Sequence, residues 1–203
     1  MDVTPYLDLE IAPRAVFDAL DERRTRPRFM LPSADGDWRA VTWGAFAKQI
    51  REAALFCTAA GMKGKDRACV YAPNRVEWMS AALGIQAAGG VIVPVYASNT
   101  AEQAAYVVEH SDARIVFVDT APLVERVLSA WGAYGAVERI VLLAGNSGGW
   151  LASFPKSGGL PDDRGREVFR KRAGEHPEAP RRHRSEGIGP VVGLEDRPVQ
   201  VQL

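Results

Sequence analysis

Residues 87–118, with the sequence AAGGVIVPVYASNTAEQAAYVVEHSDARIVFV, hold a strand, a helix and a second strand in succession. The run at 91–95 is apolar throughout, which predicts a strand with both faces covered. A second apolar run at 113–118 predicts the next strand. Between them, Thr100 and Gln103 form a capping box, Ser/Thr-x-x-Glu/Gln, which predicts the start of a helix. Two strands joined by a helix form a right-handed crossover, so this stretch predicts a parallel sheet.

The same alternation of strands and helices extends on both sides of this unit. Upstream, Asp35 and Gly36 predict a turn between two short strands, and Thr42 predicts the start of a helix that Gly61 stops. Asn74 is the expected cap of the next helix. Helices are expected at 13–21, between 42 and 61, between 74 and 89, at 100–110 and at 122–130, and strands at 28–31, 38–41, 67–72, 91–95, 113–118 and 140–143. The sequence therefore predicts an α/β fold with a doubly wound, mostly parallel sheet and flanking helices.

The overall composition is that of an ordinary globular protein. The 203 residues are 47% hydrophobic and 25% charged, which excludes full-length disorder. Basic and acidic residues number 25 each, so no net charge favours nucleic acid or an anionic membrane. The sequence has no apolar run long enough to span a membrane, and its start lacks the features of a signal peptide. Cys57 and Cys69 lie in apolar segments, so we expect buried, reduced thiols in a cytoplasmic protein.

Residues 145–203 differ from the rest of the chain in composition. They contain 10 glycines and 6 prolines, against 9 and 7 in the much longer stretch 1–144. Basic residues crowd the stretch 164–184 with few apolar residues among them, so it buries too little surface to fold. We expect 145–203 to be mostly disordered, with a short helix near 164–173 and the capacity to bind an acidic partner. A frameshift near residue 145 is a second interpretation, and a short paralogue or a sequencing error a third.

The expected division of the chain follows from these patterns. Residues 1–26 form a helical lead-in, residues 27–144 form the folded part, and residues 145–203 form the tail. The strand at 140–143 is then left as an unprotected edge of the sheet.

The phosphate-binding motifs typical of this fold class are missing from the sequence. The turn after residues 67–72 is Pro73-Asn74-Arg75 rather than Gly-x-Gly-x-x-Gly, which argues against a dinucleotide-binding oxidoreductase. Walker and Gly-x-Ser-x-Gly motifs are missing too, which argues against a P-loop NTPase and an α/β-hydrolase. Residues 145–149 (GNSGG) lack a lysine and a following helix, so we interpret them as a flexible exit rather than a phosphate cradle.

Ligands of doubly wound sheets lie beyond the carboxyl ends of the strands. In this sequence those ends are residues 72–74, 96–99 and 119–120. Asp119 stands at one of them, where it is expected either to bind a ligand or to cap the following helix.

Other candidate residues carry a structural and a functional interpretation side by side. Arg75, Glu77 and Trp78 can rim a pocket at the strand ends, or be solvated at a helix start. Trp43 and Trp78 are expected in the core. His110 stands at a helix end, where a protonated side chain gains from the helix dipole, so we interpret it as structural.

Three stretches together resemble the AMP-forming acyl-CoA synthetases, and most of all their long-chain fatty acid–CoA ligases. The first comprises residues 87–96 (AAGGVIVPVY), 100–103 (TAEQ) and 111–118 (SDARIVFV). The others are residues 41–43 (VTW) and residues 70–78 (VYAPNRVEW). This resemblance covers about residues 27–143, and implies the N-terminal subdomain of a longer adenylate-forming enzyme.

The resemblance implies a ligase that uses ATP, Mg²⁺ and coenzyme A. In that family, ATP and a carboxylic acid form an acyl-adenylate and pyrophosphate, and the thiol of coenzyme A then displaces AMP. Magnesium and cationic side chains stabilise the phosphate charge during the transfer.

The family's catalytic motifs are missing from this sequence. They include a Ser/Thr/Gly-rich loop ending in Pro-Lys-Gly, the adenine- and ribose-binding motifs, and the C-terminal domain with its adenylation lysine. No catalytic, cofactor-binding or metal-binding residue is therefore assigned. We expect the chain alone to be inactive, to bind none of the family's ligands tightly, and to be poorly soluble because its apolar surface lacks a partner.

Two alternatives to a ligase fragment remain open at this point. The chain can be a non-catalytic module that binds a nucleotide or an acyl group, or an interaction protein that pairs with another synthetase chain. Peripheral contact with a membrane is compatible with each of them.

Overall fold

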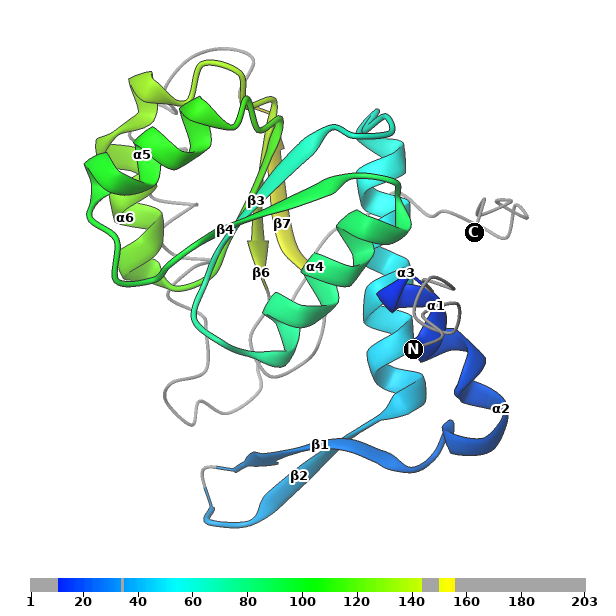
Figure 1. The fold of residues 1–203 in the computed structure, drawn as a ribbon. Helices are drawn as coiled ribbons and strands as arrows, with labels where there is room; N and C mark the ends of the chain where they lie inside the picture. The colour runs from blue at the N-terminus through cyan, green and yellow to red at the C-terminus, as the bar shows by residue number, and fades with distance from the viewer. Residues whose placement is uncertain (1–10, 34, 144–149, 156–203) are drawn as a thin grey trace, which may run out of the picture.

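The computed structural model describes residues 11–33, 35–143 and 150–155, and its elements follow the predicted alternation (Figure 1). The helices are α1 (Ala12–Asp18), α2 (Leu20–Arg23), α3 (Trp43–Ala59), α4 (Val76–Ala87), α5 (Ala101–His110) and α6 (Ala121–Ser129), with a short 3-10 helix at Trp131–Ala133. The strands are β1 (Pro27–Pro32), β2 (Trp38–Thr42), β3 (Arg67–Tyr71), β4 (Val91–Val95), β5 (Ile115–Val118), β6 (Arg139–Leu143) and β7 (Trp150–Pro155).

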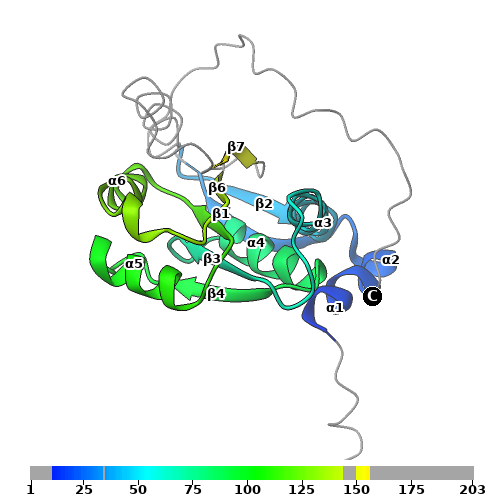
Figure 2. The same cartoon turned by 90° about the horizontal axis from the view of Figure 1, so that it is seen from above.

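The central sheet is doubly wound, as predicted. Its strand order is β4-β3-β5-β6-β7, and β3 to β6 are parallel while β7 runs antiparallel to β6. The chain enters at β3, adds β4 on one side and then crosses over to β5 on the other side. The helices α5 and α6 therefore cover one face of the sheet, and α3 and α4 cover the other (Figure 1 and Figure 2).

Alternate strand residues enter two separate cores, one on each face of the sheet. In β5, Val116 and Val118 pack with α5 and α6, whereas Ile115 and Phe117 pack with α3 and α4. All of β5 is buried, as expected for a strand covered on both faces. Both cysteines are buried free thiols, which confirms the prediction that they are buried and unpaired.

Local signals in the sequence start and stop the helices as predicted. The Thr42 hydroxyl accepts a backbone hydrogen bond at the start of α3, and Thr100 and Gln103 form the complete capping box of α5. Gly61 follows α3 with φ +81°, and Gly89 follows α4 with φ +77°. These left-handed backbone angles favour glycine and end each helix.

The strands β1 and β2 form a separate antiparallel hairpin that projects from the start of α3 (Figure 1). One face of this hairpin packs on a third core between α1, α3 and α4. The ring of Phe29 on β1 lies edge-on to that of Phe46 on α3, with centroids 5.0 Å apart. This contact fixes the hairpin to the helix.

The prediction that both faces of β4 are covered is wrong, because only Val95 of its five residues is buried. β4 is an edge strand, and Val91 keeps 46% of its surface exposed. Pro94 lies within β4 and has no N–H, so β4 is suited to an edge rather than to a position between two neighbours.

The prediction that residues 140–143 form an unprotected edge is also wrong. β7 pairs with β6 over residues 150–155, so the prediction of disorder is wrong for this segment. The unpaired backbone groups of β6 supply the template for this pairing. The predicted loop at 145–149 and the predicted helix near 164–173 lie outside the described residues.

The prediction that Asn74 caps α4 is wrong as well. The N-cap position is Arg75, with extended backbone angles and no capping hydrogen bond from its side chain. Within the part of the chain that the structure describes, no helix is long and apolar enough to cross a membrane.

Candidate functional site

The carboxyl ends of β3 and β4 border a pocket of about 240 Å³. Residues 72–74, just beyond β3, and residues 94–98, at the end of β4 and beyond it, form most of the wall. Trp78 of α4 completes it. The pocket lies at the sheet edge where the strand order predicted ligand binding, and two of the three predicted strand ends meet there.

The wall of the pocket is mainly apolar. Its apolar residues include Pro73, Trp78, Pro94, Val95 and two alanines, and Tyr96 keeps 73% of its surface exposed. The polar side chains of the wall belong to Asn74, Tyr96 and Ser98. A wall of this kind binds an apolar or planar group and orients it with a small number of hydrogen bonds.

An ion pair joins the third predicted strand end to the pocket. The buried carboxylate of Asp119 accepts a hydrogen bond of 3.1 Å from Nη1 of Arg75, and Nε of Arg75 lies 3.4 Å from Oε2 of Glu77. In the sequence, Arg75 lies between the pocket residues Asn74 and Trp78. Asp119 therefore neither caps α6 nor lines the pocket, and instead fixes the start of α4 against β5.

Arg126, on α6, holds the loop that follows β4. Its Nη1 donates to the backbone carbonyls of Ala97 and Asn99, both at 2.7 Å, and to the hydroxyl of Tyr71 at 3.3 Å. The Tyr71 hydroxyl in turn donates to the Asn99 carbonyl at 2.8 Å. Sequence reasoning missed Arg126, because its partners are main-chain atoms that only the fold brings near it.

The titratable groups with strongly raised pKa values are buried away from the pocket wall. Burial raises the pKa of the Cys57 thiol to about 12 and that of the Cys69 thiol to about 11. Burial also raises the pKa of the Tyr134 hydroxyl. None of these groups lines the pocket.

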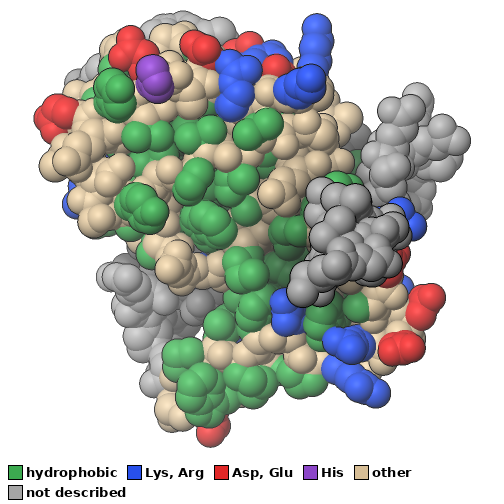
Figure 3. Space-filling model, viewed as in Figure 1, with side chains coloured by type: hydrophobic (Ala, Val, Ile, Leu, Met, Phe, Trp, Pro, Cys, Tyr) green, Lys and Arg blue, Asp and Glu red, His purple; other side chains and the backbone are tan. Residues whose placement is uncertain are grey.

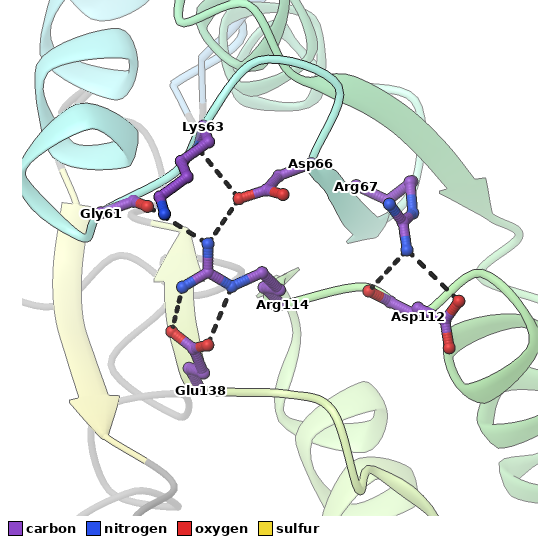
Figure 4. A network of polar contacts seen from close by, with 7 residues as sticks. All are labelled: Gly61, Lys63, Asp66, Arg67, Asp112, Arg114 and Glu138. Atoms are coloured by element: carbon purple, nitrogen blue, oxygen red, sulfur yellow. Dashed lines mark hydrogen bonds and ion pairs between the residues drawn. The ribbon is translucent and has the colours of Figure 1, made fainter.

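The opposite, amino edge of the sheet carries a network of ion pairs (Figure 4). Arg114 donates two hydrogen bonds to the Glu138 carboxylate, at 2.8 and 2.7 Å, and a third to Asp66. Arg67 lies 3.3 Å from Oδ2 of Asp112. A backbone N–H and Arg114 lower the pKa of Asp66, and Arg114 lowers the pKa of Glu138. This network ties together the turns before β3, β5 and β6, and its role is structural.

The described residues do not fit a magnesium site. Within residues 11–33, 35–143 and 150–155, no three His, Cys, Asp or Glu side chains gather as a metal site requires. The polar groups of the pocket wall are uncharged, and Arg75 holds the carboxylate of Asp119 at the neighbouring strand end.

The remaining predicted residues have structural positions. The exposed ring of His110 stacks on Tyr106 at the end of α5, with centroids 5.4 Å apart. Trp43 and Trp78 are half-buried rather than in the core. The guanidinium of Arg28 lies 4.5 Å from the centre of the Trp43 ring, and Trp78 lines the pocket. Periodicity predicted that both tryptophans face inward, but it could not show that each keeps part of its side chain exposed.

Comparison with known protein families and curated sequences places this geometry in context. Residues 18–184 match the family described as AMP-binding enzymes. The long-chain-fatty-acid–CoA ligases FadD15 of Mycobacterium bovis and Mycobacterium tuberculosis are each 32% identical to this chain over 128 residues. Those residues are 63% of this chain and 21% of each relative. The chain thus spans about a fifth of the length of these curated relatives.

Solved structures share the fold. The anthranilate CoA ligase AuaEII, in complex with anthranoyl-AMP, matches with a TM-score of 0.59 and 18% identity, over 70% of this chain and 26% of that one. The N-terminal domain of FACL13 from Mycobacterium tuberculosis matches with a TM-score of 0.55 and 18% identity, over 66% and 34%. At these identities the likeness concerns the fold alone.

Proposed function

The chain belongs to the family of AMP-binding enzymes, and on this premise we propose that it forms the N-terminal part of a long-chain fatty acid–CoA ligase. The observation that carries the proposal is the 32% identity over 128 residues to long-chain ligases. The pocket supports it, because the pocket lies at the sheet edge where α/β folds bind their ligands. A cytoplasmic location belongs to the proposal, since both cysteines are free thiols.

The proposed reaction activates a poor electrophile in two steps. A carboxylate oxygen of the fatty acid attacks the α-phosphorus of ATP, giving an acyl-adenylate and releasing pyrophosphate. The sulfur of coenzyme A then attacks the acyl carbon, its proton is lost, and AMP leaves with the electron pair of the broken bond. The residues of this chain contribute a wall of the ligand site, held in place by Arg75 and Arg126.

The chain alone does not form acyl-adenylates in this proposal. The described pocket has no cationic side chain in its wall to stabilise a five-coordinate phosphorus centre, and the family's phosphate loop is missing from the sequence.

ATP–pyrophosphate exchange with palmitate tests both parts of the proposal. The purified chain should give no exchange, and exchange should appear when it is co-expressed with the part of a FadD15 relative that follows the matched residues. That relative's segment expressed alone is the control. Exchange by the chain alone would overturn its proposed inactivity, and a stable but inactive complex would overturn its assignment as a ligase part.

A non-catalytic binding module is the second candidate function. The observation that favours it is that the described residues alone line the pocket, without any other part of a ligase. Saturable binding of ATP or palmitoyl-CoA to the chain, unchanged by the complementary segment and without exchange, would support this candidate over the first.

A further inference from the structure

The β1–β2 hairpin presents apolar residues on both of its faces. Its inner face, with Phe29, Leu31 and Val41, packs toward α1 and α3. Its outer face comprises Met30, Pro32, Trp38 and Ala40, which lie opposite one another in the pairs Met30–Ala40 and Pro32–Trp38. All four residues of this outer face are exposed, Met30 to 49% and Trp38 to 65%.

None of these four side chains is charged or hydrogen-bonding except for the indole N–H of Trp38, whereas a solvated strand face is normally polar. Hydrophobic side chains gather over the hairpin at the bottom of the space-filling view (Figure 3). A two-stranded sheet is marginal in water unless further strands or another element cover it. Within the described residues, β1 and β2 pair only with each other. A contiguous apolar surface of this kind marks an interaction site.

The comparisons indicate what covers this face. Roughly four-fifths of each mycobacterial ligase has no counterpart in the matched part of this chain, which is 21% of the relative. The matched part covers only 34% of even the N-terminal domain of FACL13. The matched fold is a minor part of each of these larger ligases. Part of its surface must therefore contact the remaining polypeptide of the ligase.

We propose that the outer face of the hairpin is the docking surface for the remaining polypeptide of a long-chain acyl-CoA ligase. This inference rests on the proposed function, and it adds the surface through which the two parts meet. The partner is expected to offer an apolar face to Trp38 and Met30. A charge introduced at Trp38 would then lose its water in the complex, so it should weaken association strongly.

Co-purification tests the docking surface without requiring activity. The tagged full chain is co-expressed with the segment of the Mycobacterium tuberculosis FadD15 relative that follows its matched residues. We expect an equimolar complex on size exclusion, and slower hydrogen exchange at residues 28–41 in the complex than in the chain alone. Trp38→Glu should lower the recovered complex at least tenfold.

Tyr106→Glu is the matched control, since Tyr106 is also 65% exposed but lies on α5. It should leave the recovered complex unchanged, and thermal melts of both variants alone should match the parent chain. The inference is overturned if no complex forms, if both variants bind alike, or if the outer face is covered instead by a second copy of this chain. Exchange activity decides the proposed function separately: a complex protected at 28–41 but inactive leaves the docking surface standing.

Discussion

Gly84 of α4 lies directly against α3, and the substitution Gly84→Ala tests how closely these helices pack. An added Cβ would lie 2.3 Å from Cβ of Ala53 and 3.0 Å from the backbone nitrogen of Ala54 and the carbonyl oxygen of Ile50. The contact matters beyond local stability, because α3 carries the hairpin and α4 carries the pocket residue Trp78.

The expected loss of stability is about 2 kcal/mol, the difference between an overpacking cost of about 3 kcal/mol and a helix-propensity gain of about 1 kcal/mol. The overpacking cost lies at the upper end of its usual range, because the contacted atoms cannot rotate away: they are backbone atoms and the Cβ of an alanine. With a urea dependence of about 2 kcal/mol per molar, the unfolding midpoint should fall by about 1 M.

Urea unfolding followed by circular dichroism measures this effect. Gly132→Ala is the control, because an added Cβ at Gly132 meets nothing within 4 Å, and its midpoint should hardly change. Adding Ala53→Gly to Gly84→Ala should restore part of the loss, since it reopens the space. Equal midpoints for the Gly84 and Gly132 variants, or no rescue by Ala53→Gly, would refute the close packing of the two helices.

Three further predictions concern single side chains. Arg126→Met removes the donor that holds the loop after β4. Hydrogen exchange at residues 96–100 should therefore rise more than tenfold, while exchange in β5 is unchanged. Unchanged exchange at residues 96–100 would contradict the role given to Arg126. Arg114→Met should lower stability at neutral pH by about 1 kcal/mol. Arg114 lowers the pKa of Glu138 below its ordinary value of 4.5. The difference in stability between the parent chain and the variant should therefore vanish as the pH falls through the lowered pKa. Thermal melts of both proteins from pH 7 to about pH 3 would detect this loss. Cys57, with its buried thiol and a pKa of about 12, should react with a thiol reagent only as fast as the chain unfolds, and rapid labelling of the native chain would contradict its burial.

Much of the fold is readable from the sequence, because its signals are local. The capping box of Thr100 and Gln103 and the hairpin turn at Asp35 and Gly36 each depend on a few neighbouring residues. The doubly wound sheet follows from the alternation of such elements, and the carboxyl edge as a binding edge follows from the sheet.

The features that were missed depend on contacts between distant segments. Pro94 within an apolar run was an available sign of an edge strand, yet the run predicted a strand covered on both faces because it is apolar throughout. The pairing of Asp119 with Arg75 joins residues from two strand ends, and Arg126 donates to main-chain and tyrosine oxygens. Residue type and spacing do not show which residues from distant segments become partners.

The central claim is that the ligand site of this chain lies at the carboxyl edge of its sheet. Hydrogen exchange of the full chain, with and without millimolar ATP, palmitate or coenzyme A, tests this claim most directly. Exchange should slow at residues 72–78 and 94–98 with at least one of these ligands. Protection confined to the amino edge, at residues 61–67 and 112–114, or no protection with any of the three, would contradict the claim.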